Sequence, residues 1–588
     1  MFFNLIVSMI IFIISLIIFV IKCMNVGLGS NDTEHRVICG CGLPCSRCCG
    51  KLCGGVSTID GTVSTIDGTV STIDGGVDLQ KDTLKKFKNL KVKKRPTFEE
   101  FCFPKSFSLQ NQQIFAGEYM KPPGPKTLMI FHRIGAGKTC LSIQIGEKWK
   151  GKGKPLYIMP ASLIPGFRNE LRSKCAGDNY LTDDERLELL EVVPGGVEYK
   201  DIINRSDERI DQSYQILSYN KFATASKIQA PLIVIDEVQN INNPTGVYYK
   251  SVLTWIENNP RASVVIMSGT PIFDDAAEIY GLAKLLRIDS EVINPTTIPR
   301  LFAGKVSYYA GAPSYTFPEA TIRIQKCKMS KHQRRWYTSE VEAEMVRQNI
   351  RLKTIANDFY IKSRQRSNIV YPNGLTGDAG LTALTATMIR NNLNVYSTKY
   401  AHLITKLKKN KLSFVYSGFT GEGGIAAITK CLRASGWSDY FEAGPGKRRY
   451  VVWSGDQTAR EKDLIRATFN SRANDNASQI QVVIGSPSIK EGVSLLRVRQ
   501  VHVMETYWNH SRLAQVYGRA VRYCSHKTLS TEDRNVMIYI YAATDGSKEL
   551  SPLHSIDLYM LDIADKKREE TDPIVRALID VAVDKALW

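Results

Sequence analysis

The feature that most constrains this chain is the stretch LMIFHRIGAGKTCL at residues 128–141. Its apolar beginning, residues 128–131, predicts a buried parallel strand, and the residues from Thr139 onward predict the start of a helix. A strand, a glycine-rich turn and a helix in that order form the setting of a phosphate-binding loop. The strict pattern has glycine at its first position, where this chain has His132.

The residues of this loop match the chemistry of phosphate binding. Gly135 and Gly137 let the backbone approach an anion closely, so the amides from Gly135 through Ala136 to Thr139 can point at a phosphate. Lys138 would reach the β- and γ-phosphates as a point charge, and the Thr139 hydroxyl would bind Mg²⁺. The sequence therefore predicts a site for a nucleoside triphosphate and its metal ion.

An acidic pair follows a second apolar strand. Residues 231–235 predict a central strand buried on both faces, and Asp236 and Glu237 come directly after it. Ligands bind at this end of the strands in an open α/β sheet. We expect Asp236 to hold Mg²⁺ and Glu237 to orient and deprotonate an attacking water. A further strand at residues 264–268 ends in small hydroxylated residues, Ser268 and Thr270, which are suited to sensing the γ-phosphate.

A second set of strands is predicted at residues 412–416, 450–453 and 481–484. It is followed by QVYGRAVR at residues 515–522, on a predicted helix, where Arg519 and Arg522 share one face. Two arginines so placed can both meet a γ-phosphate held by the other domain. The pattern predicts an α/β protein with two parallel-sheet domains in tandem.

The composition agrees with a folded protein that has a polyanionic partner. A chain of 588 residues exceeds one hydrophobic core, and 43% hydrophobic and 23% charged residues are ordinary for folded domains. The net charge of +19 suits nucleic acid first and anionic lipid second. Of the thirteen cysteines, the six from Cys102 onward are scattered singly, which predicts reduced thiols.

The N-terminal part predicts an anchor. Residues 2–21 are apolar except for Asn4, Ser8 and Ser15, and about 20 such residues span a bilayer as a helix. No basic segment precedes the run, so an uncleaved anchor is predicted rather than a cleaved signal peptide. Basic residues follow it, which places the rest of the chain on the cytosolic side of a membrane.

Low-complexity sequence follows the predicted anchor. The cysteine-rich residues 39–53 are compatible with acylation, with metal binding or with an unstructured tether. The unit VSTIDGT at residues 56–62 recurs at 63–69 and, with a final glycine, at 70–76. Glycine and Asp-Gly in each unit forbid a coiled coil, so we expect a flexible spacer. The tether is predicted to extend to residue 95.

Six segments carry a resemblance to a known family: GAGKT, DEVQ, SGTP, FVYSGF, EGVSL and QVYGRAVR. In this order and spacing they resemble motifs I to VI of superfamily 2 helicases. The chain is most similar to the helicase-like ATPases of large cytoplasmic DNA viruses, which include relatives of the poxvirus early transcription factor small subunit and nucleoside triphosphatase I. The segments QVYGRAVRYCSH, SIDLYMLDIADKK and SRQRSNIVYPNG are the most similar to that group.

The resemblance implies two RecA-like domains, with ATP in the cleft and a nucleic-acid strand across both. The anchor (1–22) and the tether (23–95) have no counterpart in this resemblance, which covers roughly residues 100–588. The remaining chain is divided into an ATP-binding domain (96–295), an insert or linker with a helical basic portion at 331–351 (296–395), a second domain (396–548) and a C-terminal helical extension (549–588).

The resemblance also implies roles for single residues. The family's catalytic positions match Lys138, Thr139, Asp236, Glu237, Arg519 and Arg522. Gln113, in a helix predicted at 109–116, is similar to the adenine-contacting glutamine, and nucleotide contacts are also implied for Gln239, Gly492 and Gln515. Contact with a nucleic-acid backbone, or its coupling to ATP, is implied for Pro160, Ser162, Ser218, Ser417 and Ser494.

Two departures from the family pattern, His132 and Gln239, remove no catalytic group. The leading expectation is therefore an ATP- and Mg²⁺-dependent helicase or translocase on DNA or RNA, anchored to a membrane in the host cytoplasm or the virion. The alternatives are an ATPase that remodels a viral RNA polymerase in transcription or termination without unwinding, and a non-catalytic virion scaffold that binds nucleic acid.

Overall fold

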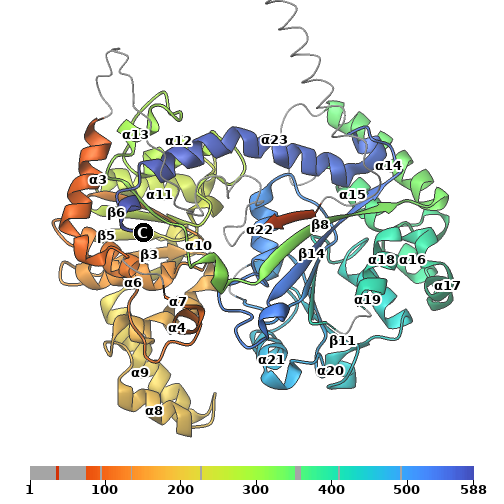
Figure 1. The fold of residues 1–588 in the computed structure, drawn as a ribbon, viewed down its shortest axis with the longest axis horizontal. Helices are drawn as coiled ribbons and strands as arrows, with labels where there is room; N and C mark the ends of the chain where they lie inside the picture. The colour runs from red at the N-terminus through yellow and green to blue at the C-terminus, as the bar shows by residue number, and fades with distance from the viewer. Residues whose placement is uncertain are drawn as a thin grey trace, which may run out of the picture.

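The computed structural model shows two sheets side by side, spanned by one long helix (Figure 1). The structure describes residues 35–38, 74–92, 96–133, 135–225, 228–350, 359–407, 411–490 and 493–588. The predicted anchor at 2–21, the cysteine-rich residues 39–53 and the first two heptapeptide repeats lie outside these ranges. Among the described helices, none is long and apolar enough to cross a membrane.

The first sheet contains, among the described residues, six parallel strands in the order β4-β3-β5-β6-β2-β7. They are β2 Thr127–His132, β3 Leu156–Met159, β4 Gln215–Ser218, β5 Leu232–Ile235, β6 Ser263–Ser268 and β7 Val306–Tyr309. Four of them (β2, β3, β5 and β6) are buried along their whole length, as parallel strands between two helical layers must be. The strands predicted for this half are confirmed.

Helices cover this sheet, and a glycine lets two of them approach closely. The helices are α5 Asn111–Tyr119, α6 Lys138–Trp149, α7 Ile164–Leu171, α8 Asp183–Glu191, α9 Val197–Ser213, α10 Tyr219–Thr224, α11 Val247–Asn258, α12 Glu278–Leu285 and α13 Ile298–Leu301. A methyl group added at Gly117 in α5 would lie 3.2 Å from the Gln144 Cβ in α6. This packing holds the helix predicted at 109–116 against the helix that follows the phosphate loop.

The second sheet has the order β1-β8-β14-β13-β9-β12-β11-β10 within the described part of the chain, and β1 alone is antiparallel to its neighbour there. Its strands are β1 His35–Ile38, β8 Glu319–Lys328, β9 Ser413–Tyr416, β10 Ser438–Asp439, β11 Arg449–Trp453, β12 Val482–Gly485, β13 Gln500–Val503 and β14 Asn535–Thr544. Its helices are α14 Lys331–Ile350, α15 Ile361–Asn368, α16 Gly377–Ala383, α17 Ala386–Tyr396, α18 Thr398–Leu407, α19 Ile425–Ala434, α20 Tyr440–Ala443, α21 Ala459–Asn470 and α22 His510–Tyr517.

The segment predicted as an insert, 296–395, is shared between the two sheets. Its first strand, β7, is the edge of the first sheet, and β8 belongs to the second. The helical portion predicted at 331–351 is present as α14. The part that separates the two sheets is therefore much shorter than predicted.

The predicted tether is wrong for residues 74–92, which belong to the folded body. They form α3 (Asp74–Lys86) and a short 3-10 turn at Lys88–Leu90. Phe87 packs edge-on against Phe115 of α5, with ring centroids 4.9 Å apart. Gln80 donates from Nε2 to the carbonyl of Asp580 (2.8 Å). β1, also in the predicted tether, pairs with β8.

The C-terminal helical extension joins the two halves. α23 (Pro552–Asp580) begins beside β14 and crosses to the first sheet (Figure 1, dark blue). Midway along it, Lys567 forms an ion pair with Asp274, which follows β6 (2.7 Å). After α23 the backbone of Val583 donates to Val306 of β7 (2.9 Å). This helix is therefore a structural link between the domains.

The prediction of scattered, reduced cysteines is wrong for four of the six after residue 100. Cys102, the last residue of α4 (Phe98–Cys102), is bonded to Cys524, and Cys140 is bonded to Cys175. Cys327 and Cys431 are free and buried. Sequence spacing gave no sign of the longer bridge, whose partners lie 422 residues apart.

We predict that replacing Cys524 with serine destabilises the protein under non-reducing conditions by about 2–4 kcal/mol, because the unfolded chain is no longer closed into a loop. The denaturant midpoint of unfolding measures this effect. In a reducing buffer the wild type and the variant should unfold at the same midpoint. Equal midpoints in the non-reducing buffer would contradict the bridge.

Candidate functional site

The phosphate loop connects β2 to α6, as predicted. Gly135 and Gly137 have φ of 83° and 72°, which glycine adopts readily and other residues avoid. α6 begins at Lys138, so its first amides and the positive end of its dipole face the loop. Gly135 and Gly137 are exposed, whereas Ala136 is buried and its carbonyl accepts from Gln112 Nε2 (3.4 Å).

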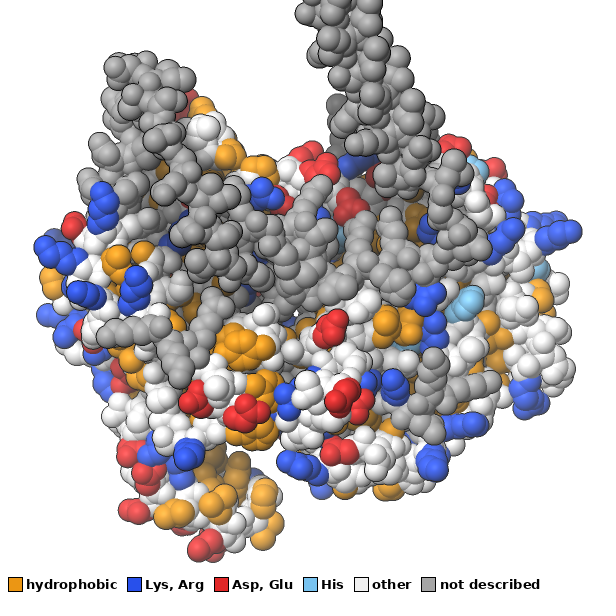
Figure 2. Space-filling model, viewed as in Figure 1, with side chains coloured by type: hydrophobic (Ala, Val, Ile, Leu, Met, Phe, Trp, Pro, Cys, Tyr) orange, Lys and Arg blue, Asp and Glu red, His pale blue; other side chains and the backbone are white. Residues whose placement is uncertain are grey.

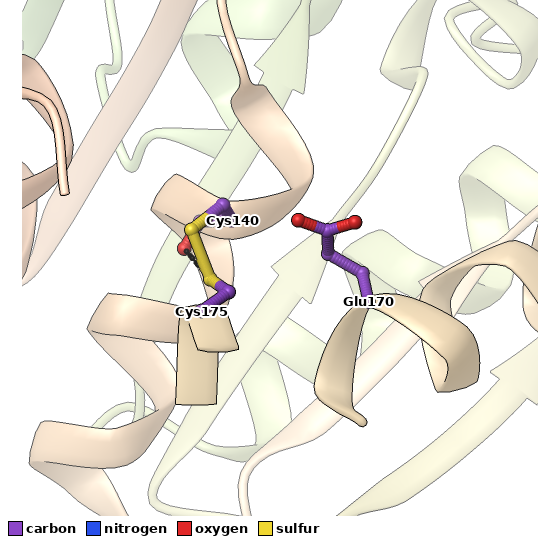
Figure 3. A group of neighbouring side chains, drawn as sticks. All are labelled: Cys140, Glu170 and Cys175. Carbon is purple, nitrogen blue, oxygen red and sulfur yellow. Dashed lines mark hydrogen bonds between the residues drawn. A yellow bond between two sulfur atoms is a disulfide. The ribbon is translucent and has the colours of Figure 1, made fainter. Parts of the chain in front are cut away.

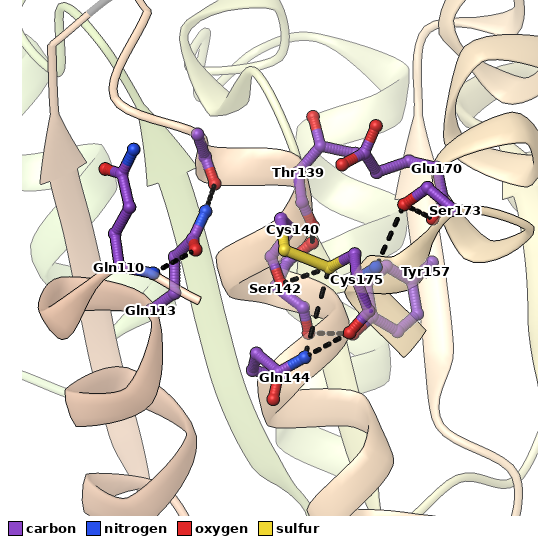
Figure 4. The surroundings of a disulfide bond; sticks show 11 residues. Gln110, Gln113, Thr139, Cys140, Ser142, Gln144, Tyr157, Glu170, Ser173 and Cys175 are labelled. Atoms are coloured by element: carbon purple, nitrogen blue, oxygen red, sulfur yellow. Dashed lines mark hydrogen bonds between the residues drawn. A yellow bond between two sulfur atoms is a disulfide. The ribbon is translucent and has the colours of Figure 1, made fainter. Parts of the chain in front are cut away.

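Gln113, predicted to contact adenine, lies against this loop (Figure 4). Its Oε1 accepts from the backbone N–H of Gln110 (2.9 Å), and its Nε2 donates to the carbonyl of Gly137 (3.3 Å). A methyl group added at Gly137 would lie 2.6 Å from this Nε2, so only glycine leaves room for the contact. The first turn of α5 and the phosphate loop are thereby joined.

The unusual His132 does not enter the anion site. Its ring is fully buried and its Nε2 is 2.8 Å from Ser307 Oγ on the neighbouring strand β7. Burial and the nearby Lys138 lower the pKa of His132 to about 3, so the ring is neutral at physiological pH. The backbone carbonyl of His132 accepts from Lys138 Nζ (3.2 Å). The departure from glycine is therefore accommodated by turning the side chain toward β7.

The acidic pair follows β5, one strand away from β2. Only β6 lies between these two strands, and all three are parallel, so their carboxyl ends share one edge. Glu237 has a φ of 53°, a conformation that costs a non-glycine residue ~1–3 kcal/mol and is concentrated at functional sites. The hydroxyl of Tyr219, from the start of α10, donates to the carbonyls of Asp236 and Glu237 and supports this turn.

A chain of hydrogen bonds joins the acidic pair to the end of β6. Gln239 donates from Nε2 to Glu237 Oε2 (2.5 Å) and accepts at Oε1 from Ser268 Oγ (2.6 Å). Ser268 in turn accepts from the backbone N–H of Thr270 (2.9 Å). Gln239 was predicted to contact nucleotide; here its amide is used to fix the orientation of the Glu237 carboxylate.

A group of side chains with metal-binding chemistry lies beside the loop. Cys140, Glu170 and Cys175 place their ligand atoms within 4.8 Å of one another (Figure 3). The two sulfurs are joined in the disulfide and are therefore not thiolates, and burial raises the pKa of Glu170. Gln144 donates to the carbonyl of Cys175 (2.6 Å; Figure 4). The disulfide joins α6 to the segment that contains Cys175. In this oxidised form the group does not supply a metal site.

The two arginines of the second domain do not lie on a helix, contrary to the prediction. α22, which contains Gln515, ends at Tyr517, and Arg519 and Arg522 follow in successive turns. Arg522 donates to Ser494 Oγ (2.5 Å) and to the carbonyl of Gly518 (3.1 Å). Burial and the neighbouring Arg519 lower the pKa of Arg522 to about 9. Gly492, the other nucleotide contact implied here, lies outside the described residues.

Tyr523, the residue after Arg522, lies beside the phosphate loop of the other domain. A methyl group added at Gly135 would lie 3.8 Å from the ring of Tyr523. Tyr523 also packs edge-on against Phe101, with ring centroids 5.9 Å apart. Asn509, at the N-terminal end of α22, donates to Asp274, which follows β6 (3.4 Å). The two domains thus approach each other both at the phosphate loop and after β6.

The residues implied for nucleic-acid contact have different surroundings. Ser162 is exposed and Pro160 half-buried just after β3. Ser218 is buried and caps α10 by accepting from Lys221 N (3.2 Å). Ser417 is fully buried and donates to Glu505 (2.8 Å), so it can act only through its neighbours. Ser494 accepts a hydrogen bond from Arg522.

A pocket in the second domain was not predicted. It has a volume of about 230 Å³ and is lined by residues that include Arg364, Phe419, Tyr507, Trp508 and Arg512. The Arg364 guanidinium lies 5.2–5.8 Å from the ring centroids of the three aromatic residues. The tract SRQRSNIVYPNG contains Arg364, but the sequence carried no sign of which rings would surround it.

The chain has relatives among viral helicases. It is 41% identical over 495 residues to a candidate ATP-dependent RNA helicase of Acanthamoeba polyphaga mimivirus, covering 78% of this chain and 86% of the relative. A candidate helicase of Invertebrate iridescent virus 3 is 25% identical over 78% of this chain, which spans only 51% of that protein. A termination factor NPH-I homolog of African swine fever virus is 22% identical over 72% of this chain and 70% of its own length.

No protein-family profile matches the chain. Among solved structures, the Sulfolobus solfataricus SWI2/SNF2 ATPase core in complex with double-stranded DNA has 14% identity and a TM-score of 0.28, over 78% of this chain and 89% of that one. The family assignment therefore rests on the sequence relatives and not on this structural comparison. Because 41% identity extends along most of both proteins, this chain belongs to the superfamily 2 helicase-like ATPases of large DNA viruses.

Proposed function

We propose that the protein hydrolyses ATP to move along or unwind nucleic acid. The proposal is supported by the proximity of the two domains at the phosphate loop, where a methyl group added at Gly135 would lie 3.8 Å from the ring of Tyr523, the residue after Arg522. An ATPase whose site is completed by a second domain can convert hydrolysis into relative domain movement. The family relationship supports the same activity.

The residues divide the chemistry of hydrolysis between the domains. The loop amides and Lys138 would bind the phosphates, and Gln113 would join the adenine contact to the loop through Gly137. Glu237, held by Gln239, would accept the proton of the attacking water. Arg519 and Arg522 would approach the γ-phosphate from the second domain and stabilise its charge in the transition state.

The donor set fits Mg²⁺. Thr139 and Asp236 offer a hydroxyl and a carboxylate oxygen at the same edge of one sheet, and oxygen ligands are those that Mg²⁺ prefers. When bound, the ion would neutralise charge on the phosphates. Both residues are half-buried, so their oxygen atoms are not sealed from solvent by the fold.

The nucleic-acid partner is supported by charge and by the pocket in the second domain. A net charge of +19 favours a polyanion, and Lys and Arg side chains lie along both sides of the face shown in Figure 2. Unpaired bases stack on aromatic faces; Arg364 and Trp508 are themselves buried, so the half-buried rings of Phe419 and Tyr507 are the ones that a base could meet. In the first domain, Ser162 is exposed after β3 and accessible to a nucleic-acid backbone.

A second candidate function is favoured by one relationship. The relatives in African swine fever virus are named as termination factor homologs. The same ATPase site would then remodel a viral RNA polymerase complex, and turnover would not separate strands.

We predict that Glu237→Gln lowers the rate of ATP hydrolysis by about 10²–10⁴-fold, because the amide cannot accept a proton from water. Binding of a fluorescent ATP analogue should persist, since Gln239 can still donate to the new side chain. Steady-state hydrolysis and analogue binding measure the two effects. The matched control is Glu191→Gln, at an exposed position at the end of α8. Unchanged turnover in Glu237→Gln would remove the assigned base.

We predict that ATP hydrolysis by the full chain increases when one class of nucleic acid is added. Single-stranded DNA, duplex DNA and RNA are compared in parallel, and the stimulating class identifies the track. A strand-displacement assay on that class then separates the two candidates: displacement supports the helicase, and stimulation without displacement supports remodelling or translocation. Hydrolysis that no nucleic acid alters would contradict both.

We also propose that residues 2–21 anchor the protein in a membrane, with the ATPase on the cytosolic side. The run of apolar residues supports this, and it lies outside the described part of the structure. Removing residues 1–22 is expected to move the protein from the membrane fraction to the soluble fraction on centrifugation. Partition that stays the same after the deletion would defeat the proposal.

A further inference from the structure

A buried chain of hydrogen bonds connects the end of α23 to the phosphate loop. His132 Nε2 lies 2.8 Å from Ser307 Oγ, which donates to Asp584 Oδ2 (2.6 Å). All three side chains are fully buried. They come from three separate elements: the end of β2, the strand β7 beside it, and the segment after α23. None of the chemistry assigned above uses them.

The Ser307 hydroxyl gives this chain a direction, because it donates to Asp584 Oδ2. Ser307 Oγ can then accept from the Nε2–H of the neutral His132 ring, and burial raises the pKa of Asp584 to about 7. The second oxygen of Asp584 accepts from the backbone N–H of Tyr308 (2.8 Å). His132 Nδ1 has no hydrogen-bond partner among the described residues, so removing Ser307 Oγ would leave the buried His132 ring without any hydrogen bond, while Asp584 would keep the bond from Tyr308.

The same C-terminal segment contacts the helix that carries Gln113. Trp588 donates from its indole nitrogen to the carbonyl of Tyr308 (3.1 Å). Its ring lies 5.8 Å from the ring centroid of Tyr309 and 6.0 Å from that of Phe115 in α5. The segment therefore braces both elements that hold the loop: β2 on one side and α5 on the other.

The other end of α23 is fixed in the second domain by another buried carboxylate. Asp557 forms an ion pair with Lys399 (2.8 Å), and both are almost completely buried. Asp557 also accepts from the backbone N–H of Ala543 in β14 (2.9 Å). A buried pair of this kind is costly to break, so this end of the helix moves with the second domain.

We infer that Asp584 is a positioning residue for the phosphate-binding loop, acting through Ser307 and His132 from the end of a helix anchored in the second domain. This inference rests on the proposed ATPase function. The link to the reacting groups is the His132 carbonyl, which accepts from Lys138 Nζ. The contact of the His132 ring with Ser307 also explains why a histidine can replace glycine at the first position of the loop.

The test is Ser307→Ala, which removes one oxygen atom and leaves the bond from Tyr308 N to Asp584 in place. We expect the Kd for a fluorescent ATP analogue and the KM for ATP to rise about tenfold, as for the loss of one buried hydrogen bond. The kcat at saturating ATP should change less than twofold, because no group that touches the reacting atoms is lost. Ser307→Thr restores the hydroxyl and should restore affinity.

Two matched controls separate positioning from general damage to the fold. Ser263→Ala deletes a fully buried hydroxyl in the same sheet that has no hydrogen-bond partner among the described residues. Asp580→Asn changes a carboxylate near Asp584 whose ion pair with Lys585 is exposed (2.6 Å). Both should bind nucleotide like the wild type, whereas Asp584→Asn should resemble Ser307→Ala.

A folded Ser307→Ala variant, checked by its thermal midpoint, that binds the analogue with wild-type affinity would overturn the inference while leaving the ATPase proposal intact. A wild-type protein that binds no nucleotide would overturn the ATPase proposal instead, and this inference with it. The two failures are distinguished because binding is measured without relying on turnover.

Discussion

The site depends on the order of three parallel strands. Because β6 separates β5 from β2 and all three run in the same direction, the phosphate loop, the acidic pair and the Ser268 turn must open at one edge of the sheet. The polar contacts there follow from this arrangement: Gln239 can reach both Glu237 and Ser268 only because their strands are neighbours. The strained Glu237 backbone is tolerated since Tyr219 and Gln239 hold it.

The second domain completes this edge and is held to it at several separate places. Tyr523 lies beside Gly135, Lys567 of α23 pairs with Asp274, and the segment after α23 lies along β7. The second domain is therefore connected to the surroundings of the phosphate loop in two ways, beside Gly135 and through α23.

The sequence predicted the chemistry of the site better than its surroundings. The loop, the acidic pair and the strands beside them are local patterns of glycine, carboxylate and apolar residues, and they lie where expected. The helix predicted for Arg519 was wrong, because α22 ends at Tyr517. Hydrophobic periodicity does not define the end of a helix to within one turn. The contacts of Gln80 and Cys102 could not be predicted, since their partners lie more than 400 residues away and no local pattern records such pairs.

The bridge between Cys102 and Cys524 also gives the molecule a covalent topology. All six strands of the first sheet, and β8 to β13 of the second, lie within the ring that it closes, whereas β14 and α23 lie outside it. A protease that cuts any single loop within this ring opens it but releases nothing. The two fragments stay joined through sulfur and migrate as one species until they are reduced, so an intact band in non-reducing electrophoresis is no proof of an uncut chain.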